Sequence, residues 1–380
     1  MRDYNIRTFI IAALVVAAAL SGTSRRAEAI PSFSMQTGLQ CDACHSSLRS
    51  TNELGESYLR NDLRLPNLGI GGRPVVALRG QLAYTSEPDP SLLPKATVDE
   101  VEAFLSARIN REFSVAGQLY MIDGGRNGSM REAWVQYESP GSFAGAPIRA
   151  TAGSITLPLP VDPETFRQTN QHYAVFDQTV GANPFAFIDP RNAASIALGN
   201  PVRGPAMTVV AAQGHDPHSG LAQTGTDRMF QAQEAFGGFV VSVYDYAGRR
   251  DLGPVGDDFR RRAFGVNLYR GRLAVETLLQ TGFDTSPNGD GVGVASSGGF
   301  LQLRYQLPRA TFAIVRYDGV NDTGGSGFGR SLTIGVNRLI SRGVRVGLED
   351  VIRHGPQATH TLNATLGFGI SNTRIGSGAY

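Results

Sequence analysis

Two cysteines and a histidine form the stretch of this sequence with the clearest chemistry. Cys41, Cys44 and His45 stand in the order Cys-x-x-Cys-His, which is the spacing at which a c-type haem is attached. Each thiol can add to one vinyl group of the same porphyrin, and the histidine that follows can supply its imidazole nitrogen to the iron. We therefore predict one covalent haem c, with Cys41 and Cys44 as cofactor-binding residues and His45 as the metal ligand.

Two other kinds of site use a Cys-x-x-Cys pair. A thioredoxin-like redox pair sits in a βαβ pattern, and no such pattern surrounds this motif. A zinc site needs two more ligands at regular spacing, whereas the remaining histidines are scattered far away: His172, His215, His218, His354 and His360. The chain has 2 cysteines among its 380 residues, so none is left for a disulfide framework. Haem attachment is the preferred interpretation.

The sixth ligand of the haem iron is left open. A methionine in that position raises the reduction potential relative to a second histidine. Met35 is close to the motif, while His172 and the His215/His218 pair lie in long loops that could fold inward. A surface histidine is the preferred interpretation for each of the three. An open or water-filled sixth position is the alternative, and it would allow small-molecule chemistry.

Acidic residues are the other candidates for metal contact. Four aspartates in or near long polar stretches are hard oxygen donors of the kind that ferrous ions accept. They are Asp284, Asp290, Asp318 and Asp322. Ordinary solvated loop charges are the preferred interpretation for all four.

The first 29 residues have the pattern of a secretory signal peptide. Arg2 and Arg7 precede an apolar run of twelve residues, and Ala27-Glu28-Ala29 is a small-x-small cleavage site. The run is too short to span a membrane as a helix. Residues 30–380 contain 31 basic and 31 acidic side chains, so they carry no net charge. Nucleic-acid-binding domains carry an excess of basic residues, which this part of the chain lacks, so we expect no nucleic-acid partner.

Residues 30–74 are predicted to form a small segment around the haem. Residues 52–63 have apolar side chains near helical spacing and are expected to form one short amphipathic helix. The Gly- and Pro-rich run 65–74 reads as a linker or turn. About 45 residues cannot bury a large core unaided, so we expect the segment to depend on its haem and on docking into a larger domain.

From residue 75 onward the apolar residues recur with a period of two. Val101 and Leu105, for example, alternate with Glu102 and Ser106, and short turn sequences such as Arg270-Gly271, Leu307-Pro308-Arg309 and 339–343 separate neighbouring runs. Strict alternation predicts strands with unlike faces. Charged residues recur on one of these faces: Arg108, Arg304, Arg316, Arg345 and Glu349.

The strand pattern favours an all-β transmembrane barrel over residues 75–380. Short turns should lie at one end and long loops at the other, the loops being 160–203, 214–227, 285–298 and 318–327. A lipid-facing exterior and a polar interior account for the two faces, and sixteen strands give about 19 residues for each strand with its connection. Fourteen or eighteen strands remain alternatives, and a soluble β-sandwich is the alternative fold.

The haem segment resembles the fused porin–cytochromes of iron-oxidising bacteria, in which a monohaem segment precedes an outer-membrane barrel. The residues that carry the resemblance are Pro31, Phe33, Gln36, Thr37, Gly38, Cys41, Cys44 and His45. Met35 stands where an arginine is usual, and the continuation after the motif is only loosely kept in Asn52-Glu53-Leu54-Gly55 and in Asn61. Residues 153–160 (GSITLPLP) are similar to a strand and turn of a porin.

The resemblance implies electron transfer across the outer membrane by a haem segment that plugs the barrel. The implied donor is extracellular Fe²⁺ or another outside donor, and the implied acceptor is a soluble periplasmic cytochrome. In that role the protein would act as an iron:cytochrome oxidoreductase. A solute porin whose haem segment is structural or sensory is the second hypothesis, and electron export to an extracellular acceptor is the third.

Overall fold

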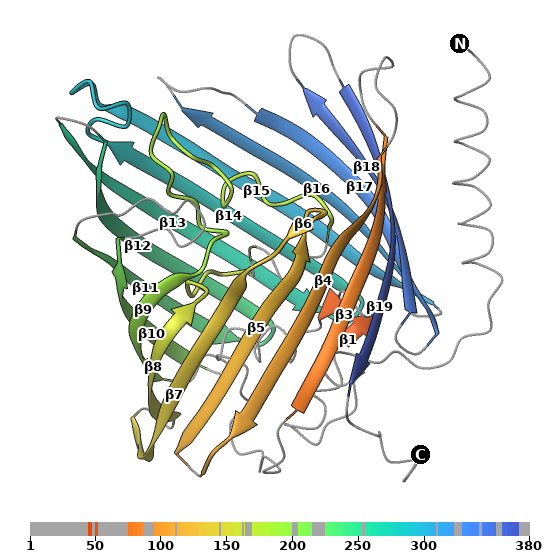
Figure 1. The fold of residues 1–380 in the computed structure, drawn as a ribbon, viewed down its shortest axis with the longest axis horizontal. Helices are drawn as coiled ribbons and strands as arrows, with labels where there is room; N and C mark the ends of the chain where they lie inside the picture. Colours follow the sequence, from red (N-terminus) through yellow and green to blue (C-terminus); the bar gives the residue numbers. More distant parts are fainter. Residues whose placement is uncertain are drawn as a thin grey trace.

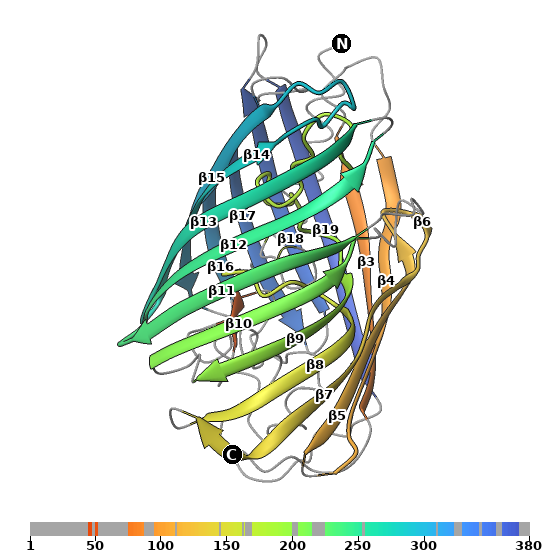
Figure 2. The same ribbon diagram turned by 90° about the vertical axis from the view of Figure 1, so that its left-hand side faces the viewer.

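A closed antiparallel β-barrel makes up most of the described chain in the computed structural model (Figures 1 and 2). The described residues are 45–47, 50–51, 75–86, 95–110, 112–143, 146–161, 163, 169–199, 204–214, 225–252, 255–308, 311–322, 329–341, 344–354 and 359–371. Sixteen long strands each pair with their neighbours in the chain, and the first pairs with the last, with Thr85 opposite Asn363. The prediction of a sixteen-stranded barrel is confirmed, and the β-sandwich alternative is wrong.

The barrel strands are nine to fifteen residues long, and a further two-residue strand extends one hairpin. They are β3 (Val75–Thr85), β4 (Lys95–Arg108), β5 (Phe113–Asp123), β6 (Arg126–Asn127), β7 (Met130–Phe143), β8 (Ala146–Ile155), β9 (Arg191–Gly199), β10 (Gly204–Gln213), β11 (Thr226–Phe236), β12 (Phe239–Asp251), β13 (Gly256–Arg270), β14 (Leu273–Asp284), β15 (Val294–Leu307), β16 (Thr311–Asp322), β17 (Gly329–Ser341), β18 (Val344–His354) and β19 (Thr359–Ser371).

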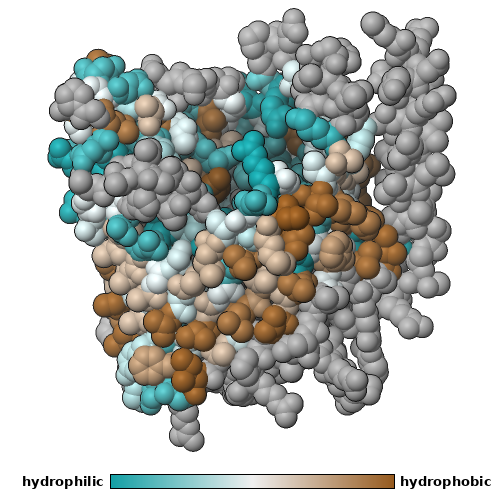
Figure 3. Space-filling model, viewed as in Figure 1, coloured by the Kyte–Doolittle hydropathy of each residue, from teal (hydrophilic) through white to brown (hydrophobic). Residues whose placement is uncertain are grey.

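The two faces of each strand differ as the alternation predicted. On β4, Glu102 is fully buried on the lumen side, whereas Leu105 is 47% exposed on the outside. The same holds for four of the charged residues that the sequence grouped on one face, because Arg304, Arg316, Arg345 and Glu349 are all buried in the lumen. The side chain of Arg108 lies outside the described part of the chain. Figure 3 shows hydrophobic side chains gathered in a band around the lower part of the barrel, with hydrophilic ones above it.

Short turns lie at one end of the barrel and longer connections at the other. Gly271 and Arg272 join β13 to β14, one residue later than predicted, and Gly271 adopts φ 59°, which suits a tight hairpin. The other two predicted turns fall between β15 and β16 and between β17 and β18, although Leu307 still belongs to β15 and residues 339–341 still belong to β17. Because β3 begins at the short-turn end, the N-terminal part of the chain joins the barrel there.

The long loops are shorter than predicted. The strands continue into the polar sequence that was assigned to the loops. The stretch 160–203 contains β9, the stretch 214–227 ends in the start of β11, and the stretch 285–298 contains the start of β15. Asp318 likewise belongs to β16, which continues to Asp322. Polar side chains at these strand ends do not interrupt the backbone pairing, since the ladder bonds are made by the main chain.

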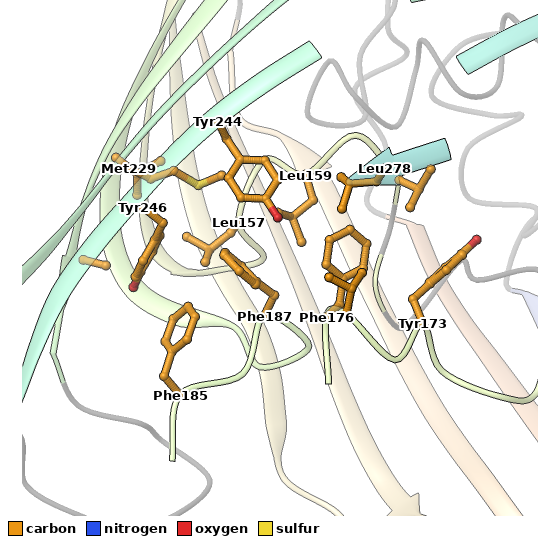
Figure 4. Packing of buried hydrophobic residues seen from close by; sticks show 14 of the residues in the cluster. Leu157, Leu159, Tyr173, Phe176, Phe185, Phe187, Met229, Tyr244, Tyr246 and Leu278 are labelled. Carbon is orange, nitrogen blue, oxygen red and sulfur yellow. The ribbon is translucent and has the colours of Figure 1, made fainter. Parts of the chain in front are cut away.

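The apolar core of the protein lies inside the barrel. In the connection from β8 to β9, the described residues 156–161 and 169–190 fold into the lumen and pack on the walls formed by β10 to β15 (Figure 4). The sequence indicated a long polar loop over residues 160–203, with an inward fold only as a way for His172 to reach the haem, so it did not predict an apolar core here. We call residues 169–190 the inner segment.

The haem motif is only partly within the described residues. His45 begins β1 (His45–Ser47), which pairs antiparallel with β2 (Ser50–Thr51), with His45 opposite Thr51. Cys41, Cys44, the signal peptide (1–29) and the predicted helix (52–63) lie outside the described residues. Among the residues that are described, no helix has the length and apolar character needed to cross a membrane.

Candidate functional site: the barrel lumen

The lumen is where the described charged and aromatic side chains converge, and the inner segment is its central feature. Strand alternation turns every second wall residue inward. The wall therefore presents a dense set of guanidinium and carboxylate groups to whatever enters the barrel. The inner segment meets these groups mainly through its backbone.

Arg316 of β16 is the main link between the wall and the start of the inner segment. Its guanidinium donates to the Thr169 hydroxyl and, through Nη2, to the carbonyl oxygens of Gln171 and His172, both at 2.9 Å. Its Nε donates to Asp318 at 2.6 Å, and the guanidinium lies 4.5 Å from the centre of the Tyr173 ring. Arg316 is fully buried, so its charge is balanced inside the lumen by Asp318.

Two wall carboxylates accept hydrogen bonds from backbone amides of the inner segment. Glu349 of β18 accepts from the N–H groups of Asn170 and Gln171 at 2.8 and 2.9 Å. Asp318 accepts from the N–H of Ala174 at 3.3 Å. Charged acceptors strengthen such bonds. The wall thus binds the carbonyls of this short stretch through a guanidinium group and its amides through carboxylates.

The far end of the inner segment is anchored on the other side of the barrel. The Asn183 side chain donates to Asp257 at 2.7 Å and to Asp284 at 3.2 Å, and Asp284 also accepts from Arg261 at 2.6 Å. Arg131 of β7 donates to the carbonyl of Ile188 at 2.7 Å. The inner segment is thus fixed to the wall near both of its ends.

An aromatic cluster fills the space between the inner segment and β12 to β15. Phe187 lies 5.4 Å from Tyr244 and 4.9 Å from Phe185, and Tyr173 lies 4.5 Å from Phe300, all between ring centres (Figure 4). These rings are almost completely buried. This half of the lumen is therefore closed by packed side chains at the level of the inner segment.

The wall opposite the aromatic cluster carries a charged network on β3, β4 and β5. Arg79 donates to both Glu100 and Glu102, and Gln118 donates to Glu102 at 2.9 Å. Gln81 accepts from Arg345 at 2.7 Å. The lumen therefore has one side filled by packed aromatic and apolar side chains, which also holds buried ion pairs such as Arg261–Asp284, and a second side lined by the network around Arg79. We call this second side the charged side.

Two of the four aspartates expected as solvated loop charges are instead buried in the wall. Asp284 ends β14 and pairs with Arg261, and Asp318 in β16 pairs with Arg316; both carboxylates are fully buried. That interpretation was wrong for these two residues, because an inward-facing carboxylate in a filled lumen needs a cationic partner. Asp290 does lie exposed in a loop, where it accepts from the N–H of Val292 at 3.0 Å, and Asp322 is the last residue of β16.

Of the candidate sixth ligands, the structure describes only His172. Its Nδ1 lies 3.6 Å from Asp177 Oδ2 within the inner segment, and its backbone carbonyl accepts from Arg316. Met35, His215 and His218 lie outside the described residues, as do both thiols of the motif. Within the part of the chain that the structure describes, no three His, Cys, Asp or Glu side chains come together as a metal site.

Comparisons with known proteins identify the fold. No protein-family model and no curated protein matches the chain. Among solved structures, an anion-selective porin from Comamonas acidovorans matches with a TM-score of 0.61 and 11% identity over 79% of this chain and 99% of that one. OmpF of Salmonella typhi, solved in complex with daunomycin, gives 0.59 and 11% over 78% and 97%. The outer membrane channel DcaP of Acinetobacter baumannii gives 0.52 and 10% over 78% and 96%.

The chain has the fold of an outer-membrane porin. This agrees with the porin half of the resemblance noted in the sequence. The identities are too low to carry more than the fold.

Proposed function

We propose that this protein is an outer-membrane monohaem c-type cytochrome fused to a porin-like barrel. It moves single electrons across the outer membrane, from extracellular Fe²⁺ to a soluble periplasmic cytochrome. Residues 1–29 export the chain, residues 30–74 carry the haem, and the barrel holds that segment in the membrane. Cys41 and Cys44 attach the haem and His45 is its proximal ligand.

The observation that carries the proposal is a haem-attachment motif placed directly ahead of a closed barrel. The two thiols and the imidazole are the donor set that c-type haem requires, and the chain has no other cysteine. Haem supplies a one-electron couple, while the protein supplies position, ligation and burial.

The way the chain enters the barrel supports the same function. The first barrel strand, β3, begins at the end with the short turns. In outer-membrane barrels short turns are periplasmic and long loops are extracellular. The chain therefore enters the barrel at Val75 from the periplasmic side, which supports the proposal that a soluble periplasmic cytochrome reaches the haem segment from there.

The partly filled lumen also supports an electron conduit. The inner segment and its aromatic cluster already occupy the side of the lumen along β12 to β15. Because the inner segment already fills part of the lumen, a haem segment on the charged side has less volume to fill than it would have in an empty sixteen-stranded barrel. Electrons can cross such a filled lumen, whereas solutes cannot.

The direct test is reduction of the purified, oxidised protein by Fe²⁺ under anaerobic conditions. We expect the absorption bands of a reduced c-type haem to appear. The Cys41→Ser/Cys44→Ser variant should carry no covalent haem and show no bands, while its barrel still shows the heat-dependent gel mobility of a folded barrel. An oxidised spectrum that Fe²⁺ leaves unchanged at the working pH would exclude iron as the donor.

A solute porin is the second candidate function. The charged lumen wall and the likeness to an anion-selective porin favour it. In that case the haem segment is structural or sensory, and the barrel conducts ions.

Export of electrons to an extracellular acceptor would use the same residues in the opposite direction. Oxidation of the pre-reduced protein by a ferric chelate, measured beside its reduction by Fe²⁺, separates the two directions. We expect reduction by Fe²⁺ to be the faster reaction.

A further inference from the structure

The outward face of β12 carries an apolar hollow and then a cluster of charges. The hollow has a volume of about 380 Å³ and is lined on the outside by Leu198, Pro205, Met207, Ala232, Val241 and Val243, with the exposed Glu234 at its short-turn end. Ala232 lies opposite Met207 on one side and Val243 on the other. The hollow forms because the small side chain of Ala232 lies between the larger side chains of Met207 and Val243.

The charge cluster begins at the next outward residue of the same strand. Asp245 accepts from Arg260, through Nε at 2.9 Å and Nη2 at 2.5 Å, and from Nε of Arg262 at 2.9 Å. The side chains of Arg260 and Arg262 are 52% and 59% exposed. Within the described residues, Arg262 donates only its Nε, so its outer nitrogens point to the surroundings.

Positive charge is in excess at this place. Arg228 is also exposed and faces outward in the same row as Arg260, with Ala247 between them in the strand pairing. Arg260 and Arg262 thus flank the Asp245 carboxylate, and Arg228 adds a third guanidinium one strand away, so these four residues carry an excess of two positive charges. The next row carries one negative charge in excess, because Arg249 lies 3.7 Å from Asp258 and 4.0 Å from Asp251, so one positive charge remains in excess over both rows.

The hollow and the arginines lie at different heights of the barrel wall. Val243 is closer to the short-turn end of β12, and Arg260 and Arg262 are closer to the long-loop end of β13. Long loops of such barrels face the outside of the cell. The hollow therefore faces acyl chains of the membrane, and the arginines lie toward the outer-leaflet headgroups.

We propose that Arg228, Arg260 and Arg262 and the hollow beneath them form a binding site for a phosphorylated, acylated glycolipid of the outer leaflet. A guanidinium binds a phosphate through two parallel hydrogen bonds and is less strongly hydrated than an ammonium group. One acyl chain fills the hollow around Ala232 and buries apolar surface there. Asp245 fixes the positions of the Arg260 and Arg262 side chains through its hydrogen bonds to both, whether or not a lipid is bound.

The test measures lipid binding to the full-length, haem-loaded protein in detergent after removal of endogenous lipid. Native mass spectrometry follows titration with diphosphoryl lipid A and, in parallel, with phosphatidylethanolamine. We expect diphosphoryl lipid A to bind about tenfold more tightly, the gain of one charge-assisted contact pair. The Arg260→Gln/Arg262→Gln variant should lose this preference.

The matched control is Arg270→Gln/Arg272→Gln, which removes two exposed arginines at the short-turn end of the barrel. It should bind diphosphoryl lipid A as the unaltered protein does. Equal loss in both double variants, or an unchanged preference in Arg260→Gln/Arg262→Gln, would overturn the proposal. Heat-dependent gel mobility confirms that each variant is folded.

A third variant, Ala232→Leu, fills the hollow without touching the arginines. It should weaken binding of acylated lipid A several-fold and leave binding of the deacylated phosphorylated disaccharide unchanged. If Ala232→Leu instead dissociates an oligomer in light scattering and leaves lipid binding intact, the hollow holds a second copy of the chain and the lipid site is refuted.

Discussion

Arg316 shows how a single wall residue fixes the interior of the barrel. Its guanidinium is fully buried and holds Thr169, Gln171, His172 and Asp318 together. Replacing it by Met leaves the Asp318 carboxylate buried without its counter-charge. We expect Arg316→Met to lower the free energy of unfolding by about 3–5 kcal/mol, measured by urea unfolding in vesicles. The fluorescence of Trp134, the one tryptophan and a partly buried neighbour of the aromatic cluster, reports the transition.

Two further variants separate loss of the ion pair from general disruption. Arg353 also donates to the inner segment, to Gln171 Oε1 at 2.9 Å, but that contact is exposed, so Arg353→Met should cost less than about 1 kcal/mol. Arg316→Met/Asp318→Leu removes both charges and should recover part of the loss, since no unpaired charge remains. A double variant less stable than Arg316→Met would contradict this account.

Gly153 in β8 is required by the backbone. Its φ is 136°, a conformation that L side chains rarely adopt, and an added Cβ would collide with the carbonyl oxygen of Ala133 on β7. We expect Gly153→Ala to destabilise the barrel by about 1–3 kcal/mol, seen as a lower temperature of the heat-dependent gel shift. Gly141→Ala is the control, because nothing lies within 4 Å of its added Cβ. Equal shifts for the two variants would mean that this backbone strain is unimportant.

At the scale of elements, strands were predictable and the inner segment was not. The inward placement of Arg304 and Glu349 could be predicted from the period of two. Successive side chains of a strand point to opposite faces whatever its neighbours are, so this pattern can be read from the local sequence. The burial of Asp318 and the entry of residues 169–190 into the lumen depend on contacts with strands more than a hundred residues away, such as the 144-residue separation between Asp318 and Ala174. A signal was present: Tyr173, Phe176, Phe185 and Phe187 are too apolar for a solvated loop.

The aromatic cluster predicts that the inner segment is a fixed element of the barrel. Phe187 is 2% exposed and its ring lies within 6.1 Å of those of Phe176, Phe185, Tyr244 and Tyr246. We expect Phe187→Ala to cost about 3–5 kcal/mol and to open residues 169–190 to limited proteolysis. Phe187→Leu keeps most of the volume and should cost less than about 1.5 kcal/mol. Cleavage of the unaltered inner segment at the rate seen in Phe187→Ala would show that the packing does not hold it.

For the whole molecule, the sequence predicted the barrel and the chemistry of the haem site separately. Cys41, Cys44 and His45 predict a covalent haem because thiol addition and imidazole ligation depend on spacing alone, and this stays a prediction. Where the haem rests relative to the lumen depends on tertiary contacts of residues 30–74, which no local pattern encodes. The same limit applies to the sixth ligand, since His172 is brought near Asp177 and Arg316 only by the fold of the inner segment.

Ion conductance decides between a filled conduit and a solute channel. If residues 30–74 lodge beside the charged wall of β3 to β5, the full chain should pass almost no ions in a planar bilayer. Deleting residues 30–74 should then raise the conductance at least tenfold, because the packed apolar cluster around the inner segment lies along β10 to β15 and not on β3 to β5. Arg79→Gln in the deletion variant should alter ion selectivity, since Arg79 faces the lumen between Glu100 and Glu102. A full chain that conducts as freely as the deletion variant would establish a solute porin and refute the plugged conduit, whether or not haem is attached.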